Sequence, residues 1–233
     1  MKLYTAKFKL TFTEPLLGSQ PLNRELLEAY IASKAPTTEA TLEEVDNTPQ
    51  EEKVENKSTG FASDGNSLLM WDYQLRGMFK ETMKVMIELG ETVNPSLNVW
   101  NIHGAVDNFL FVNPRRIYLR NADGSNITKA HDFLQRSIRV KTAQGDRVAI
   151  ARSEKVDPGS WLEFEVRLMV SDKKNKKAEK VSKIEPEDLK NCLLYGSQRG
   201  FGQWRSGGYG RYNWTTLSEK LIEDTAIKAI AAA

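Results

Sequence analysis

Two distant segments of the chain alternate strictly between apolar and polar side chains, and this alternation restricts the fold more than any other feature. In residues 3–13 the apolar positions are Tyr4, Ala6, Phe8, Leu10 and Phe12. In residues 161–170 they are Leu162, Phe164, Val166 and Leu168. A period of two is typical of a β-strand that buries one face and exposes the other. We therefore expect a sheet with one covered face, which excludes an all-helical fold.

Helical periodicity is strongest in residues 72–89, where Asp72 is a candidate N-cap. Its apolar stripe consists of Leu75, Met78, Phe79, Met83, Met86 and Ile87. A second helix is framed by Pro186, at the first helical position, and by Gly196, just past the end. Its inward positions are Leu189, Leu193 and Leu194. A short helix is also predicted for residues 22–32.

Residues 109–120 are predicted to form a strand pair or one strand bent around Pro114, and further strands are predicted for 147–151 and 209–217. The order is then strand, helix, an elaborated middle, strand, strand, helix and strand. We predict an α+β fold with a ferredoxin-like or RRM-like βαββαβ core and insertions, in a single domain over residues 1–233. Its sheet is mostly antiparallel and carries helices on one face.

Two segments are predicted to lie outside this core. Residues 35–60 are acidic and contain no aromatic residue, so they bury too little apolar surface to offset their ordering entropy. They are expected to form a mobile acidic insertion, either an ordinary solvated loop or a charged flap over a basic groove. Residues 218–233 are rich in alanine and are predicted to form a C-terminal helix.

Rare residues and apolar runs exclude several classes of protein. The one cysteine, Cys192, forms no internal disulfide and indicates a reducing compartment. Together with His103 and His131 it cannot supply a Cys/His zinc site. No signal peptide is recognisable, and no segment approaches the roughly 20 apolar residues that span a bilayer. We expect a cytoplasmic protein without a membrane segment.

Charge is distributed unevenly along the chain. The net charge of +2 excludes a uniformly basic coat for nucleic acid. However, residues 36–57 contain seven acidic and two basic residues, a local charge of −5. Residues 113–152 contain nine basic and three acidic residues, a local charge of +6. The near-neutral total therefore hides a local basic surface.

Residues 195–214 combine glycine, arginine and aromatic residues at high density. This segment holds six of the 15 glycines, six aromatic residues, three arginines and no acid. Glycine allows close approach of the backbone to a ligand, arginine engages phosphates, and aromatic rings stack on bases. A dinucleotide-binding loop is excluded because Arg205 replaces the third glycine and the segment leads from helix to strand. The structural alternative is a tight connection with aromatic packing.

Two other segments are basic. In the helix 72–89, Arg76, Lys80 and Lys84 form a row on one side, and Gly77 suggests that something approaches the backbone closely. The alternative is a plain amphipathic helix with Arg76 in a salt bridge. Around a turn at Gly145 lie Arg136, Arg139, Lys141, Arg147 and Arg152. They predict a basic hairpin finger that follows a nucleic-acid strand, or a merely solvated hairpin.

Several pieces of the chain resemble the RAMP superfamily, which supplies backbone subunits of CRISPR effector complexes. The matching pieces are Gln74-Leu75-Arg76-Gly77, Arg147-Val148-Ala149-Ile150, Pro158-Gly159 with Glu163-Phe164-Glu165, and Gly200 to Arg211. The chain also resembles an uncharacterised family of phages and prophages, through Glu14-Pro15-Leu16-Leu17-Gly18 and Gly202-Gln203-Trp204-Arg205. The superfamily resemblance implies an RRM-like core that binds single-stranded RNA in a bacterial cell, often as one unit of a filament. Some members cleave RNA with an aspartate, but that residue is not carried over here.

The expected function is binding of single-stranded nucleic acid, with RNA favoured over DNA as the ligand by the resemblance, and with copies of the chain or other RAMP-like subunits along the strand. The predicted contact residues are Arg76, Lys80, Arg139, Lys141, Arg147, Arg199, Trp204, Arg205, Tyr209, Arg211 and Tyr212. No catalytic residue, metal or cofactor is expected. One alternative is a phage-encoded module that binds or inhibits a host CRISPR-type ribonucleoprotein. The weakest is a metal-dependent nuclease that uses Asp46, Asp64 or Asp72.

Overall fold

A computed structural model describes residues 2–22, 58–94, 97–142, 145–170 and 184–222. The side chains of residues 138–149 lie outside this description. The predicted helix at 22–32 therefore falls beyond the described residues except for Leu22, which is buried. Most of the predicted acidic insertion, residues 35–57, also falls outside.

A four-stranded antiparallel sheet forms the centre of the fold. Its strands, in spatial order, are β12 (Tyr212–Ile222), β1 (Lys2–Phe12), β11 (Trp161–Val170) and β7 (Leu110–Asn113). The two alternating segments of the sequence are therefore adjacent strands, with Phe8 opposite Phe164. Their apolar faces are buried on the same side, because paired residues of neighbouring strands point the same way. The predicted α+β class is confirmed.

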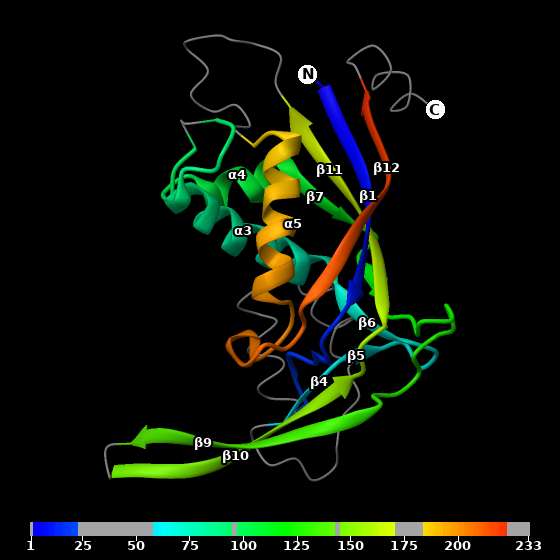
Figure 1. The fold of residues 1–233 in the computed structure, drawn as a ribbon, viewed down its shortest axis with the longest axis vertical. Helices are drawn as coiled ribbons and strands as arrows, with labels where there is room; N and C mark the ends of the chain where they lie inside the picture. Colours follow the sequence, from blue (N-terminus) through cyan, green and yellow to red (C-terminus); the bar gives the residue numbers. More distant parts are fainter. Residues whose placement is uncertain (1, 23–57, 95–96, 143–144, 171–183, 223–233) are drawn as a thin grey trace, which may run out of the picture.

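Three helices lie on one side of this sheet (Figure 1). They are α3 (Asp72–Leu89), α4 (Ile102–Phe109) and α5 (Pro186–Arg199). The stripe of α3 packs onto the sheet, with the rings of Phe79 and Phe164 6.3 Å apart edge to face. The predicted bounds of α3 are confirmed. Asp72 is its first residue rather than its N-cap, and the N–H of Trp71 donates to the Gln74 side chain at 2.8 Å.

Two smaller sheets lie below the central one. The first contains β2 (Leu16–Leu17), β3 (Gln20–Pro21), β4 (Ser58–Gly60), β9 (Asp132–Thr142) and β10 (Gly145–Val156). The second contains β5 (Ala62–Ser63), β6 (Leu68–Trp71) and β8 (Arg116–Tyr118). Strands β9 and β10 form a long hairpin that extends away from the body (Figure 1). The predicted hairpin finger and the strand pair around Pro114 are confirmed.

Three predicted boundaries are wrong. Residues 58–60, assigned to the mobile insertion, form β4, which pairs with β10 and β3. Residues 218–222, assigned to a C-terminal helix, continue β12 because they pair with β1. Helix α5 ends at Arg199 instead of before Gly196, and Gly196 is buried where a side chain would overlap the Tyr212 hydroxyl.

Two further features differ from expectation or were not anticipated. Leu194, predicted to face inward, is 62% exposed because it lies on the outer side of α5. Helix α4 was not predicted at all. Among the described residues, no helix has the length and apolar character needed to cross a membrane.

Candidate nucleic-acid interface

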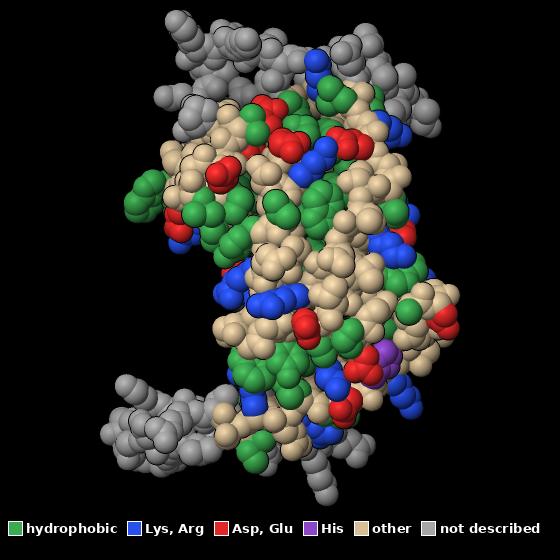
Figure 2. Space-filling model, viewed as in Figure 1, with side chains coloured by type: hydrophobic (Ala, Val, Ile, Leu, Met, Phe, Trp, Pro, Cys, Tyr) green, Lys and Arg blue, Asp and Glu red, His purple; other side chains and the backbone are tan. Residues whose placement is uncertain are grey.

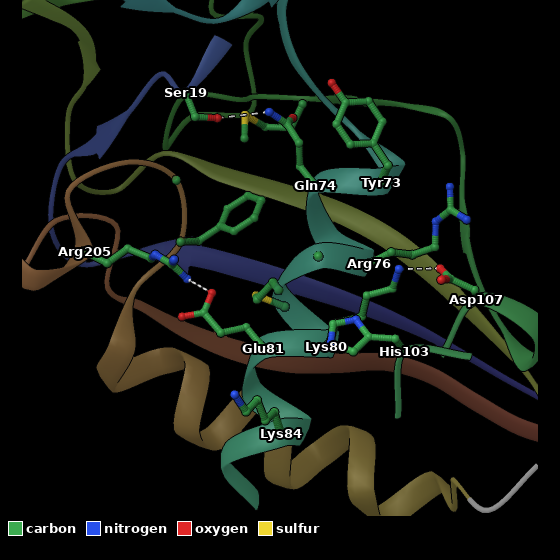
Figure 3. A pocket seen from close by; sticks show the side chains of 15 residues that line it. Ser19, Tyr73, Gln74, Arg76, Lys80, Glu81, Lys84, His103, Asp107 and Arg205 are labelled. Carbon is green, nitrogen blue, oxygen red and sulfur yellow. Dashed lines mark hydrogen bonds and ion pairs between the residues drawn. The ribbon is translucent and has the colours of Figure 1, made fainter. Parts of the chain in front are cut away.

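A groove of about 690 Å³ runs along α3. Helix α3 forms its floor, and α4, Ser19 just before β3 and the glycine-rich loop form its sides (Figure 3). Its polar lining consists of Ser19, Tyr73, Gln74, Arg76, Lys80, Glu81, Lys84, His103, Asp107 and Arg205. The lining thus contains four Lys or Arg side chains and two carboxylates.

The floor of the groove exposes backbone at Gly77. Among the described residues, no atom outside the helix backbone and the chain neighbours lies within 4 Å of the place that a Cβ would take. Arg76, Lys80 and Lys84 flank this gap at intervals of four residues, about 6 Å each along the helix axis. The predicted basic row and the open glycine therefore belong to one surface.

Each cation of the groove has a carboxylate partner. Arg76 binds Asp72 at 3.0 Å within α3, as the amphipathic-helix alternative predicts. Lys80 binds Asp107 of α4 at 2.5 Å, and Lys84 lies 3.9 Å from Glu88. The three cations are at least a quarter exposed, although Asp72 is only 14% exposed, so solvent screens these pairs and each contributes about 1 kcal/mol or less. The pairs are weak enough for an external anion to exchange with them.

The glycine-rich loop after α5 is fixed by close backbone packing. Gly200, Gly202 and Gly210 all have positive φ, and a side chain at any of them would overlap backbone atoms. The Phe201 N–H donates to the Gly210 carbonyl, and the Gly210 N–H donates to Pro15, each at 2.9 Å. The loop is therefore a rigid platform that presents Arg205 to the groove.

Trp204 joins this loop to the base of the hairpin. Its ring stacks on Tyr209, with centroids 5.1 Å apart and planes 20° apart. The Arg136 guanidinium lies 4.2 Å from the Trp204 centroid. The neighbouring Gln203 side chain accepts hydrogen bonds from Thr59 at 2.5 Å and Ser153 at 3.0 Å. In this structure Trp204 and Tyr209 therefore pack against each other, as expected for a tight connection with aromatic packing.

The predicted contact residues fall into several groups. Arg76, Lys80 and Arg205 line the groove, and Arg199 reaches its edge through Glu81. A separate cavity of about 380 Å³ is lined by Tyr209 and Arg211, together with Glu14, Pro15, Gly207 and Gly208. The structure places Arg139, Lys141 and Arg147 in the β9–β10 hairpin, and their side chains lie outside the described residues.

Tyr212 cannot stack on a base as predicted. Its side chain is 1% exposed, its ring packs edge to face against Phe12, and its hydroxyl donates to the Met78 sulfur at 3.5 Å. Burial also raises the pKa of this hydroxyl. Tyr212 is the first residue of β12, and its side chain points into the core.

Sequence reasoning missed the acidic and α4 components of the groove. Glu81 and Asp107 line it, and His103 lies beside Lys80 (Figure 3). Lys84 continues the basic row and was recognisable from its spacing alone. Asp107 was not recognisable, since α4 itself was not predicted.

The alternative chemistries receive little support from the described residues. Within them, no group of three or more His, Cys, Asp or Glu side chains is arranged to hold a metal ion. Asp64 accepts the N–H groups of Asn66 and Ser67 in a turn, Asp72 binds Arg76, and Asp46 lies outside the described residues. Burial raises the pKa of the Cys192 thiol to about 12, so it is not a reactive nucleophile at neutral pH.

Comparison with protein-family models and with curated proteins finds no match for this chain. The function must therefore be inferred from the chemistry of the groove.

Proposed function

We propose that this protein binds single-stranded nucleic acid, with RNA as the expected ligand, in the groove along α3. The observation that carries the proposal is the combination of Arg76, Lys80 and Lys84 with the exposed backbone at Gly77. Cations neutralise phosphates, and a glycine in the floor lets a strand lie close to the helix. Lys and Arg side chains also gather around the lower end of α5, beside an indentation of the surface (Figure 2).

We further propose that the central sheet and two of its helices form a ferredoxin-like core of RAMP type. In support, the spatial order β12-β1-β11-β7 corresponds to 4-1-3-2 if these strands are numbered along the chain. Helix α3 lies between the first and second of these strands, and α5 between the third and fourth. This order is the one that a βαββαβ core would have, which supports the proposal. Copies of the chain, or related subunits, would then follow one another along the strand.

Binding to labelled oligonucleotides tests this proposal. We expect fluorescence anisotropy to detect binding of a 30-nucleotide single-stranded RNA, with weaker binding of DNA of the same sequence and of RNA duplex. Changing both Arg76 and Lys80 to Gln should weaken RNA binding at least tenfold, because each charged contact contributes about 1 kcal/mol or more. The matched control is Lys190→Gln on α5, which removes an equally ion-paired cation outside the groove. Equal losses in both proteins would contradict the proposed site.

One observation favours a second candidate, a protein-interaction module that acts on a host ribonucleoprotein. Large apolar side chains are exposed at the end of α3 and in the connection to α4: Leu89 is 62%, Val93 54% and Trp100 95% exposed. Exposed apolar groups of this size are typical of protein interfaces. Co-purification with a ribonucleoprotein that Trp100→Ala abolishes, together with no binding to naked RNA, would favour this candidate.

A further inference from the structure

Glu81 differs from the other carboxylates of the groove because two arginines from separate elements converge on it. Arg205 Nη1, from the glycine-rich loop, lies 2.5 Å from Glu81 Oε2. Arg199 Nε, at the end of α5, lies 3.5 Å from Glu81 Oε1. Each of the two carboxylate oxygens therefore faces its own guanidinium. Figure 3 shows Glu81 pointing from α3 toward Arg205, while Lys80 points toward Asp107.

The two guanidinium groups form an anion-binding site, and the anion bound there is the carboxylate of Glu81. Guanidinium groups bind carboxylate and phosphate oxygens with the same planar donors. We propose that Arg199 and Arg205 form a phosphate subsite, and that Glu81 occupies it until a phosphate group displaces the carboxylate. The proposal depends on the proposed function only in taking this group to be a backbone phosphate of the bound strand.

The surroundings allow Glu81 to leave. The side chains of Glu81, Arg199 and Arg205 are 38%, 37% and 27% exposed, so the ion pairs are screened by solvent and inexpensive to break. A helical side chain lies over the turn that precedes it, which for Glu81 is the turn of Gly77. That position has no side chain and opens into the groove. A rotamer change of Glu81 therefore has free space in which to place the carboxylate.

The backbone that carries the two arginines, in contrast, is fixed by contacts that do not involve Glu81. Arg205 lies within the loop whose glycines pack against backbone, and Arg199 is the last residue of α5. The subsite is thus preorganised by the fold, while its internal anion competes with the ligand. Neutralising Glu81 should therefore strengthen phosphate binding.

Inorganic phosphate tests the subsite without nucleic acid. We expect Glu81→Gln to bind phosphate about two- to fivefold more tightly than the wild type, which corresponds to a partly exposed ion pair. The melting temperature of each protein is measured in phosphate and in chloride at equal ionic strength, and the difference between the two reports phosphate binding. The matched control, Glu88→Gln, makes the same charge change on the same helix but next to Lys84. A response of Glu81→Gln no larger than that of Glu88→Gln would overturn the proposal.

A second variant shows whether the gain in phosphate binding comes from the freed arginines or only from the loss of one negative charge. Adding Arg205→Gln to Glu81→Gln should abolish the gain in phosphate binding. If the gain persists, the arginine does not form the subsite and the proposal is wrong.

The same proteins, titrated with the 30-nucleotide RNA, distinguish this proposal from the proposed function. Tighter RNA binding by Glu81→Gln than by Glu88→Gln supports both. RNA binding that is equal in the two, with no phosphate response, refutes the subsite and leaves the function standing. A phosphate response without RNA binding in any variant supports the subsite and refutes the function.

Discussion

Gly208 and Gly210 lie two residues apart in the glycine-rich loop, and both have positive φ, +87° and +71°. Their surroundings differ, however. A Cβ at Gly208 meets no described atom within 4 Å, whereas a Cβ at Gly210 would overlap the Phe201 backbone. The two positions therefore separate the cost of backbone strain from the cost of lost packing.

We predict that Gly210→Ala lowers the free energy of unfolding by about 3 kcal/mol or more, because strain and overlap add. Gly208→Ala should cost only about 1 kcal/mol, from strain alone. Urea denaturation of both variants measures the difference. Equal losses would mean that the loop is not held by close packing at Gly210, contrary to its role as a rigid platform.

The helix α3 combines a structural face with the floor of the groove, and Gly77 lies on the groove side. A glycine inside a helix costs about 1 kcal/mol relative to alanine. Since a Cβ at this position meets no described neighbour, nothing in the packing of α3 requires the glycine. Its presence is explained if a ligand needs the space.

We predict that Gly77→Ala raises the free energy of unfolding by about 0.5–1 kcal/mol. Gly77→Glu should keep most of this gain yet weaken RNA binding at least tenfold, because it places a bulky anion in the path of the strand. Chemical denaturation and anisotropy measure the two effects. Unchanged RNA binding by Gly77→Glu would exclude the floor of α3 from the binding path.

Elements with a long and regular pattern could be predicted from the sequence, and short or tertiary-determined ones could not. The stripe of α3 and the alternation in β1 and β11 define these elements without further information. Strand β6 is buried at all four positions and shows no alternation. Residues 218–222 have a helix-like composition, but pairing with β1 extends them as a strand.

The groove could be predicted in part. The row of Arg76, Lys80 and Lys84 follows from helical spacing. The contact between Glu81 and Arg205 joins residues 124 positions apart, which spacing cannot reveal. Tyr212 and Tyr209 lie in one glycine-rich segment, yet only the sheet register shows that Tyr212 is buried.

At the scale of the whole molecule, the basic side chains of the groove are paired with carboxylates of the same chain, and the proposed ligand would replace these partners. The net charge of +2 does not oppose the proposed binding, because phosphates would take the place of the carboxylates that now pair with the groove cations. Replacement of such pairs and release of counterions both make the affinity depend strongly on salt.

The most direct measurement is the dependence of RNA affinity on salt, for the wild type and for the protein with Arg76 and Lys80 both changed to Gln. For single strands each phosphate contact contributes a slope of about −0.7 in log K against log salt. We expect a steep negative slope for the wild type, and a slope shallower by about 1.4 for the double variant. Absence of binding at low salt, or an unchanged slope in the variant, would contradict binding of a strand in the α3 groove.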